Sequence, residues 1–471
     1  MIKDSLYLYN TANRTKEHFT LPQGIPEVRM YACGPTVYHY AHIGNLRTYL
    51  FEDLLRRSLE YFGFKVRHVV NITDVGHLTS DQDDGEDKME MSAERMGKSV
   101  LEIAEFYSAK FKEDLKHLNI LPPTVWCKAT DHIKDQIELI KKLEEKGYTY
   151  RTSDGIYFDS LKFPRYADFA RLDIAGLKSG ARVNLGEKKF ATDFALWKFS
   201  PKDRKRAMEW NSPWGVGFPG WHIECSAMSM AHLGETLDIH CGGTDHIRVH
   251  HTNEIAQSEC ATGKQFARFW MHGEFLRENN SEKMSKSSGD FLTLDFLIKK
   301  GFDPMAYRLF SLTSHYRNYL NFSWEAMENA QESLNSLRKR TQPFIGIEGG
   351  VKNVDAREWS LKFKEYIGDD LNSSAAMGVL NLMLADSALE DSEKAALIKE
   401  FDGVLGLRLL EKVEKAKHSV EDVAKVEALI KERDVARENK NFGESDRLRD
   451  VLLGLGVIVK DGKDGADWEW K

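Results

Sequence analysis

The sequence contains few cysteines, and their arrangement does not indicate disulfide bonds. Five are present among the 471 residues, at positions 33, 127, 225, 241 and 260. An odd number of widely spaced cysteines argues against a disulfide framework. We therefore expect free thiols in a reducing compartment, where they can bind a metal.

Long apolar runs are also lacking. No stretch approaches the roughly 20 apolar residues of a membrane-spanning helix, and the first residues, Met1-Ile-Lys-Asp-Ser5, lack the apolar core of a signal peptide. We therefore expect a cytoplasmic protein without membrane contact. An excess of positive charge is lacking as well, because the net charge is −7 and residues 411–471 form no basic tail. A nucleic-acid partner would therefore have to bind to local basic patches.

The sequence does contain a strand–turn–helix–strand pattern near its start. The apolar segments 28–33 and 66–73 flank a helix whose leucines recur at helical spacing from Leu46 to Leu59. This order of elements predicts a βαβ unit with two parallel strands and a right-handed crossover. Such units bind nucleotides at the carboxyl ends of their strands, where the start of the helix presents unpaired N–H groups to a phosphate.

The turn before this helix differs from the common phosphate-binding loops. It has neither the three-glycine dinucleotide fingerprint nor a GxxxxGK[ST] loop. It has His42-Ile43-Gly44-Asn45 instead, in which the imidazole and the carboxamide can donate hydrogen bonds to a triphosphate. Gly44 lets the nucleotide approach the backbone closely. His42, Gly44 and Asn45 are therefore candidates for binding a triphosphate.

A second candidate phosphate-binding segment lies far downstream. Lys283-Met-Ser-Lys286-Ser suits a leaving pyrophosphate, because cations offset its growing charge. Asp245 follows an expected strand at 237–240 and could bind the ribose hydroxyls of ATP. The two segments resemble the HIGH and KMSKS signatures of class I aminoacyl-tRNA synthetases, although Asn45 replaces the last histidine of HIGH. The pair predicts ATP-dependent activation of a carboxylate. The resemblance implies roles in catalysis for His42, Asn45, Lys283 and Lys286, and in ATP binding for His42, Gly44, Asn45, Asp245 and Lys286.

Thiol, imidazole and carboxylate side chains recur in three segments. Cys33 ends the first strand, and Cys225 lies within 220–228. His250 and Glu254 project from one face of an expected helix, because they are four residues apart. Such a mixture of ligands suits zinc. The residues alone do not single out this set, because five neighbours could equally be ligands: His222, His240, Cys241, His246 and His251.

A closer resemblance selects among them. Four segments resemble cysteinyl-tRNA synthetase: 33–38, 220–228, 238–245 and 250–254. In that family one zinc ion binds the substrate thiolate directly and is held by four residues, whose matching positions here are Cys33, Cys225, His250 and Glu254. Further positions lie near the bound cysteine, and these match Gly34, Thr73 and Trp221.

Zinc gives a chemical reason for choosing cysteine over serine, which differs from it by one atom. An apolar pocket separates such near-isosteres by only about 1–3 kcal/mol. A thiol, with a pKa of about 8.5, is deprotonated when it coordinates zinc, whereas an alcohol is a poorer ligand. Four protein ligands normally close a structural zinc site. The substrate must therefore add a fifth ligand or displace a weak one, for which Glu254 is the candidate.

The resemblance implies an α/β fold and an enzyme. The fold is a Rossmann-like class I synthetase catalytic domain with an insertion, followed by a helical bundle and a small C-terminal anticodon-binding domain. The enzyme would ligate L-cysteine to tRNA(Cys) through a cysteinyl adenylate, using ATP with Mg²⁺ and one Zn²⁺ per chain, and we expect a monomer. The expected domains are the first half of the catalytic domain (1–120), the insertion (121–218), the second half of the catalytic domain (219–276), the KMSKS loop with a stem-contact region (277–323), the helical bundle (324–415) and the anticodon-binding region (416–471).

Two other functions would use many of the same residues. One is an ATP-dependent ligase that joins cysteine to an amino sugar, and such enzymes lack much of the segment 411–471. The other is a non-catalytic, zinc-containing RNA-binding protein, which would not need an intact segment 283–287.

The remaining chain is mostly helical in pattern. Near its end, Trp468 and Trp470 could stack on unpaired bases or cap a small core. Helical patterns are expected over 92–118, 131–146, 293–300, 324–410 with one break at 345–350, 423–440 and 446–455. Further helices are expected from about His250 to just before Gly263, and from Asp303-Pro304, where Asp can cap and Pro can occupy the first helical position.

Overall fold

The computed structural model divides the chain into two compact units, Met1–Leu410 and Glu411–Lys471. No described helix is both long and apolar enough to cross a membrane. The described residues are 5–76, 87–173, 187–201, 206–278, 282–283, 292–350, 354–412, 420–462 and 465–470.

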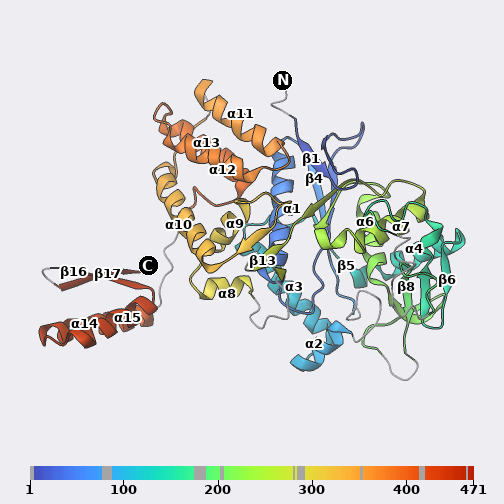
Figure 1. Cartoon of the computed structure of the whole chain (residues 1–471), viewed down its shortest axis with the longest axis horizontal. Coiled ribbons are helices and arrows are strands. Elements are labelled where there is room, and N and C mark those ends of the chain that lie inside the picture. Colours follow the sequence, from blue (N-terminus) through green and yellow to red (C-terminus); the bar gives the residue numbers. More distant parts are fainter. Residues whose placement is uncertain are drawn as a thin grey trace. The chain divides into compact units, whose positions relative to one another are not determined.

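A parallel sheet forms the centre of the larger unit (Figure 1). Its strand order is β12-β11-β3-β4-β5. The predicted βαβ unit is confirmed, because β3 and β4 pair in parallel and α1 connects them. The chain order reverses at β3, and ligands of such sheets bind near this switch point at the carboxyl ends of the strands. The elements are β3 (Val28–Ala32), α1 (Ile43–Tyr61), β4 (Val66–Ile72), β5 (Val125–Lys128), β11 (Leu237–Gly243) and β12 (Ala267–Gly273).

Side chains at the end of β3 alternate between the two faces of the sheet, as a period of two requires. Met30 and Ala32 are buried in the core that contains α1. Tyr31 and Cys33 are buried in the core that contains the next two helices. The Cys33 thiol therefore lies on the face opposite α1. The two helices on that face are α6 (Trp221–Leu233) and α7 (His250–Thr262).

A second, antiparallel sheet interrupts the chain between β5 and α6. Its strand order is β6-β7-β8-β10-β9, and α4 (Ile133–Glu145) precedes it within the helix expected at 131–146. β5 pairs in parallel with β4, so the parallel sheet extends into the stretch expected to be the insertion, 121–218. The antiparallel strands are β6 (Thr149–Arg151), β7 (Gly155–Phe158), β8 (Phe194–Phe199), β9 (Trp210–Ser212) and β10 (Gly215–Pro219).

The helix expected at 92–118 is instead two helices, α2 (Lys88–Met96) and α3 (Val100–His117). Gly97 ends α2 in the left-handed conformation, with φ at +62°. Ser99 then begins α3 with a capping box. The prediction of one helix was wrong because the apolar residues keep their helical spacing across this turn.

The stretch 324–410 is helical, but the prediction of one break was wrong. Besides the expected break, the chain turns at 369–372 and at 386–390. Neither turn contains glycine or proline, so the sequence gives little sign of them. The helices of the larger unit after the sheet are α8 (Leu294–Lys299), α9 (Pro304–Leu312), α10 (Trp324–Thr341), α11 (Val354–Gly368), α12 (Ser373–Ala385) and α13 (Asp391–Leu405).

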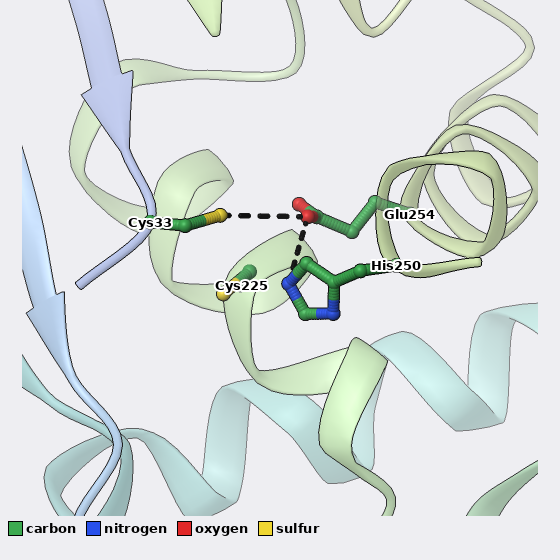
Figure 2. A group of neighbouring side chains, drawn as sticks. All are labelled: Cys33, Cys225, His250 and Glu254. Atoms are coloured by element: carbon green, nitrogen blue, oxygen red, sulfur yellow. Dashed lines mark hydrogen bonds and ion pairs between the residues drawn. The ribbon is translucent and has the colours of Figure 1, made fainter. Parts of the chain in front are cut away.

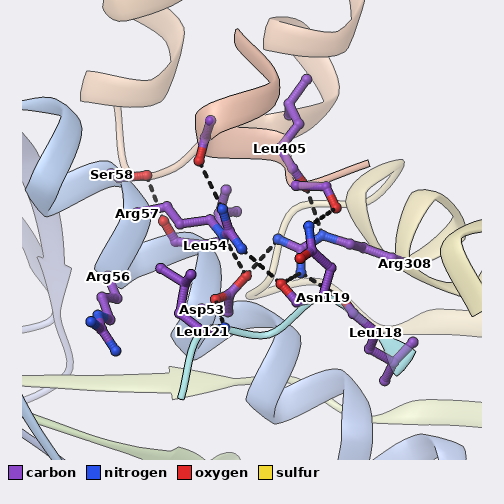
Figure 3. A network of polar contacts seen from close by, with 12 residues as sticks. Asp53, Leu54, Arg56, Arg57, Ser58, Leu118, Asn119, Leu121, Arg308 and Leu405 are labelled. Atoms are coloured by element: carbon purple, nitrogen blue, oxygen red, sulfur yellow. Dashed lines mark hydrogen bonds and ion pairs between the residues drawn. The ribbon is translucent and has the colours of Figure 1, made fainter. Parts of the chain in front are cut away.

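A buried network of charged side chains fixes α1 to these helices (Figure 3). Arg308 on α9 donates a hydrogen bond to the carboxylate of Asp53 on α1 at 2.5 Å, and Arg57 donates to the same carboxylate at 2.8 Å. Other nitrogens of the Arg308 guanidinium donate to the backbone carbonyls of Leu405, at 2.6 Å, and Leu118, at 2.9 Å. The network therefore sets the position of α1 relative to α9 and the end of α13.

Two small sheets complete the larger unit. One is a hairpin near the amino terminus, and the other leads into the segment 283–287. The hairpin strands are β1 (Tyr7–Asn10) and β2 (Thr15–His18), and the other strands are β13 (Leu276–Glu278), β14 (Glu282–Lys283) and β15 (Leu320–Phe322).

The smaller unit is two helices and a β-hairpin. Its core contains Val426, Ile430, Leu452 and Val457, and Trp468 packs against this core. This position supports the capping role of Trp468 over base stacking, while the side chain of Trp470 lies outside the described part of the chain. The elements are α14 (Val420–Glu438), α15 (Phe442–Gly454), β16 (Val457–Gly462) and β17 (Gly465–Trp470).

Candidate active site

Two thiols meet at the carboxyl end of the parallel sheet. Cys33 directly follows β3 and is 6% exposed, and Cys225 lies on α6 and is 2% exposed. Helix α6 follows Gly220, where a Cβ atom would lie 2.0 Å from the carbonyl oxygen of Ala195 on β8. Glycine at this position therefore lets α6 start close enough to the strand to carry Cys225 to the sheet.

Helix α7 supplies two side chains that point toward these thiols (Figure 2). Nε2 of His250 lies 3.1 Å from Oε1 of Glu254, which is one helical turn further along. The same carboxylate oxygen lies 3.9 Å from Sγ of Cys33. One ligand atom from each of Cys33, Cys225, His250 and Glu254 lies within 4.8 Å of the others, and all four residues are buried.

A second group of side chains overlaps with the first. Cys33 and Glu254 also lie within 4.8 Å of His240 on β11 and His251 on α7. Nε2 of His240 lies 3.0 Å from Oε2 of Glu254, and Nε2 of His251 lies 3.4 Å from Sγ of Cys33. The two oxygens of Glu254 therefore face different imidazoles, that of His250 and that of His240.

The other candidate ligands that the sequence did not exclude lie outside both groups. Nδ1 of His222 lies 2.9 Å from Nδ1 of His250, so His222 contacts the far side of a candidate ligand. Cys241 is buried in the core on the α1 face, away from the thiol of Cys33. His246 lines the neighbouring cleft.

Burial favours the uncharged forms of the Cys33 thiol and the His251 imidazole. It raises the pKa of the Cys33 thiol well above its usual value, and the neighbouring Cys225 and Glu254 raise it further. Burial also lowers the pKa of His251 well below its usual value, as do His240 and other adjacent histidines. Thiols, neutral imidazoles and a carboxylate are the ligands that zinc accepts, and a bound cation would turn the thiols into thiolates. The donor set therefore fits the expected metal.

A cleft of about 370 Å³ opens beside the candidate ligands. Its lining includes Cys33, Cys225 and His250, so a molecule in the cleft can reach the metal position. Trp221 also lines it, with its ring centroid 4.6 Å from that of His250. Asp245 belongs to the same lining.

Asn71 holds together two residues that the sequence placed near the substrate. Its Oδ1 accepts a hydrogen bond from the backbone N–H of Gly34 at 2.7 Å, and its Nδ2 donates to Oγ1 of Thr73 at 3.0 Å. A Cβ atom at Gly34 would lie 1.6 Å from the backbone oxygen of Asn71, so only glycine fits there. All three residues line the cleft. Sequence reasoning missed Asn71, and the one signal was a polar residue among the apolar residues Val69, Val70 and Ile72 of β4.

A reciprocal pair of hydrogen bonds caps the start of α1. Nδ1 of His42 accepts from the backbone N–H of Asn45 at 3.1 Å, and Oδ1 of Asn45 accepts from the backbone N–H of His42 at 3.4 Å. These two residues thus form a capping box, a structural role that the sequence did not predict. Asn45 lines the cleft, whereas His42 and Gly44 are not among its lining residues. The carboxamide Nδ2 of Asn45 is not used in the box and can donate to a phosphate.

The two expected catalytic lysines lie at the edge of what the structure describes. The backbone of Lys283 is in β14, opposite Arg277 of β13. Lys286 lies outside the described residues, so its predicted role in ATP binding stays a prediction.

Family models match most of the chain. The model for the catalytic domain of class I (C) tRNA synthetases matches residues 21–332, and the model for the cysteinyl-tRNA ligase anticodon binding domain matches residues 423–468. A cysteine–tRNA ligase 1 of Burkholderia lata is 53% identical over 460 residues, which cover 98% of this chain and 96% of the relative. A cysteine–tRNA ligase of Treponema denticola is 45% identical and covers 99% of both chains.

Solved structures agree on the fold. The methionyl-tRNA synthetase of Mycobacterium tuberculosis in complex with methionyl-adenylate has a TM-score of 0.55 at 16% identity, and the alignment covers 81% of this chain and 88% of that one. The LeuRS–tRNA–LeuAMS complex of Agrobacterium radiobacter has a TM-score of 0.57 at 12% identity, with coverage of 83% and 84%. The relatives support neither the amino-sugar ligase nor the non-catalytic protein. The chain belongs to the cysteine–tRNA ligase family of class I aminoacyl-tRNA synthetases.

Proposed function

We propose that the protein attaches L-cysteine to tRNA(Cys) in an ATP-dependent reaction that passes through cysteinyl adenylate. The observation that carries the proposal is the group Cys33, Cys225, His250 and Glu254, three of whose members line the cleft that Asn45 at the start of α1 also lines. One cleft thus offers a sulfur-selective end and a phosphate-binding end. We also propose the domain division that the sequence predicts, from the catalytic domain to the anticodon-binding region. Strand β5 lies within the predicted insertion but belongs to the parallel sheet.

The four residues would hold one zinc ion. When bound, zinc supplies a cation that stabilises the thiolate form of the substrate and binds it more strongly than a hydroxyl. Cys33 and Cys225 would lose their protons on binding the metal. Glu254 is the ligand expected to loosen for the substrate, because its second oxygen already has a partner in His240, 3.0 Å away.

Thr73, Trp221 and the backbone of Gly34 would position the rest of the cysteine. The substrate carboxylate is already ionised, so it needs no general base to attack the α-phosphorus of ATP. An oxygen–phosphorus bond forms, the bond to pyrophosphate breaks, and pyrophosphate leaves with the electron pair.

Other side chains would hold the nucleotide, which enters with Mg²⁺. His42, Gly44 and Asn45 at the start of α1 would steady the phosphates, and Asp245 would accept hydrogen bonds from the ribose. Lys286, with Lys283 beside it, would offset the charge that develops on the leaving pyrophosphate.

The smaller unit would read the tRNA. It contains the segment matched by the anticodon-binding model, 423–468. Its most exposed large apolar side chain is that of Phe442, at 64%, which suits stacking on an unpaired base. We further propose that the protein works in the cytoplasm as a monomer.

Aminoacylation of tRNA(Cys) with cysteine and with serine, on a sample of known zinc content, tests the proposal. We expect cysteine-dependent ATP–pyrophosphate exchange, transfer of cysteine to tRNA, about one zinc per chain, and no measurable charging with serine. Cysteine-dependent exchange without transfer to tRNA would favour a different acceptor, and absence of exchange would refute the enzyme activity.

A further inference from the structure

One side of the cleft has no role in the proposed function. It consists of five aromatic side chains, here called the aromatic wall: Tyr38, His39, Tyr40, Tyr107 and Phe111. The first three lie between β3 and α1, and the other two lie one turn apart on α3. Three of the candidate metal ligands, together with Asn45 and Asp245 of the proposed ATP-binding residues, lie elsewhere in the same lining. The aromatic wall is therefore available to another part of the reaction.

The rings of the wall hold one another in place. Tyr107 is 3% exposed, and His39 stacks on it with ring centroids 6.0 Å apart and planes 10° apart. Tyr40 meets the same ring edge-on at 5.1 Å. Phe106, the neighbour of Tyr107, packs against both tyrosines. Three rings of the wall, those of His39, Tyr40 and Tyr107, thus support one another in the absence of a ligand.

Tyr40 is the part of the wall that solvent reaches. It is 39% exposed, although three aromatic rings support it. A large ring fixed at its base and exposed on its face is the platform that proteins use to stack unpaired bases.

Positive charge accompanies the wall. Nζ of Lys88, on α2, lies 5.7 Å from the centre of the Tyr38 ring, and Lys88 itself lines the cleft. Nζ of Lys98 lies 4.8 Å from the centre of the Phe106 ring. Aromatic rings interspersed with lysines fit a nucleic-acid strand, whose bases stack and whose phosphates attract cations. The chain as a whole carries a net charge of −7, so the attraction to a phosphate would come from these local lysines and not from the overall charge.

We propose that the aromatic wall binds the unpaired 3′-terminal nucleotides of the acceptor RNA, with Tyr40 stacking on a base and Lys88 near a phosphate. This inference rests on the proposed function. It places the terminal ribose beside the aminoacyl adenylate, where a ribose hydroxyl oxygen bonds to the carbonyl carbon. The bond from that carbon to the phosphate oxygen breaks, AMP leaves with the electron pair, and the hydroxyl proton passes to the phosphate or to solvent.

A binding experiment with trimmed RNA tests the stacking directly. The affinity of tRNA(Cys) for the protein is measured with the intact RNA and with RNA that lacks its unpaired 3′-terminal nucleotides. We expect Tyr40→Ala to weaken binding of the intact RNA by roughly 5- to 100-fold, the range for loss of one stacked base. Binding of the trimmed RNA should be the same for both proteins. An equal loss with the trimmed RNA would overturn the proposal.

The two steps of the reaction give an independent readout. Tyr40→Ala should slow transfer of cysteine from preformed adenylate to tRNA at least about tenfold more than it slows ATP–pyrophosphate exchange, and Tyr40→Trp should restore transfer. A raised KM for ATP with unimpaired transfer would mean that Tyr40 stacks on the adenine of ATP, which contradicts the proposal. Tyr366→Ala on α11 is the matched control, because Tyr366 is 41% exposed and should affect neither step.

Salt dependence tests the lysine. Lys88→Gln should reduce the slope of log affinity against log salt concentration by about 0.7, the value for one phosphate contact on a single strand. An unchanged slope would remove Lys88 from the site. If the unaltered protein shows cysteine-dependent exchange and transfer while these variants behave like it, the aromatic-wall proposal fails and the proposed function stands.

Discussion

Two buried polar clusters in the larger unit differ in the partners of their carboxylates. On the α1 face, the carboxylate of Asp53 accepts hydrogen bonds from the guanidinium groups of Arg57 and Arg308 (Figure 3). On the opposite face, the carboxylate of Glu254 has thiols and imidazoles around it (Figure 2), and no described lysine or arginine pairs with it. The first cluster is complete within the protein, whereas the second is a set of electron-pair donors that could hold a cation.

The pKa shifts follow the same division. Burial raises the pKa of Asp53, but Arg308 and Arg57 outweigh it and hold the pKa below its usual value. Burial raises the pKa of the Cys33 thiol well above its usual value, and the neighbouring thiol and carboxylate add to that shift. The difference teaches that one face of the sheet carries a charge network for stability, while the other carries a site for a ligand.

Breaking the complete cluster should have the largest effect. Arg308→Met should lower the free energy of unfolding by about 3–5 kcal/mol, because it removes one partner of a buried ion pair. Urea unfolding of the purified variant measures this loss. Arg56→Met is the matched control on α1, where a more exposed arginine pairs with Glu60 and should cost less than about 1 kcal/mol. A loss for Arg308→Met no larger than that of the control would contradict the account.

Removing a ligand from the open cluster should affect metal binding more than folding. Cys225→Ala should abolish zinc binding and lower kcat/KM for cysteine activation at least about 100-fold, since even residues outside the ligand shell change metal sites by roughly 10- to 100-fold. The unfolding midpoint of the metal-free protein should move far less than for Arg308→Met. Cys260→Ala is the control, because this buried thiol on α7 lies outside both candidate ligand groups. Full zinc content in the Cys225→Ala variant would disprove its role as a ligand.

A pair of histidine variants separates the two overlapping ligand groups. His250→Ala should lose zinc, whereas His240→Gln should weaken zinc binding only about 10- to 100-fold, because His240 acts through its hydrogen bond to Glu254. Zinc titration against a competing chelator measures both. The opposite order of losses would assign the metal to the group that contains His240 and His251.

The smallest expected effect is a change in the pH dependence of stability. Burial lowers the pKa of His68 to about 3, and the nearby Arg56 adds to the shift. As the pH falls below about 6.5, His68 becomes protonated in the unfolded chain but stays neutral in the folded chain. The free energy of unfolding is therefore highest above that pH and decreases below it. His68→Gln should remove about 1 kcal/mol of the loss between pH 7 and pH 5.5. Unfolding midpoints at both pH values test this, and an unchanged difference would mean that His68 protonates in the folded state.

Local sequence patterns predicted the elements that carry the proposed nucleotide site. The βαβ unit followed from two apolar segments and the helical spacing of leucines between them. Asp303 and Pro304 marked the start of α9, and Asp303 accepts the capping hydrogen bond there. Such signals are local, because each depends on residues within a few positions of one another.

Elements buried on nearly all sides gave no such signal. Helix α6 has no polar stripe, since residues 222–229 are all buried, and its helical period was not recognised. Chemistry alone could not choose among the candidate ligands either, because the choice depends on which face of the sheet each side chain meets. The alternation along β3 separates Cys33 from Cys241, and this could be used only once α6 and α7 were known to cover the face opposite α1. It leaves both groups that share Cys33 and Glu254.

The central claim is that the protein selects its amino acid through a bond between sulfur and a metal held by Cys33, Cys225, His250 and Glu254. Replacing zinc with cobalt and recording the absorption spectrum before and after adding each amino acid tests this claim most directly. We predict that cysteine produces a new thiolate-to-cobalt band, and that serine at the same concentration produces none. A spectrum that cysteine leaves unchanged, in protein that still activates cysteine, would contradict the account.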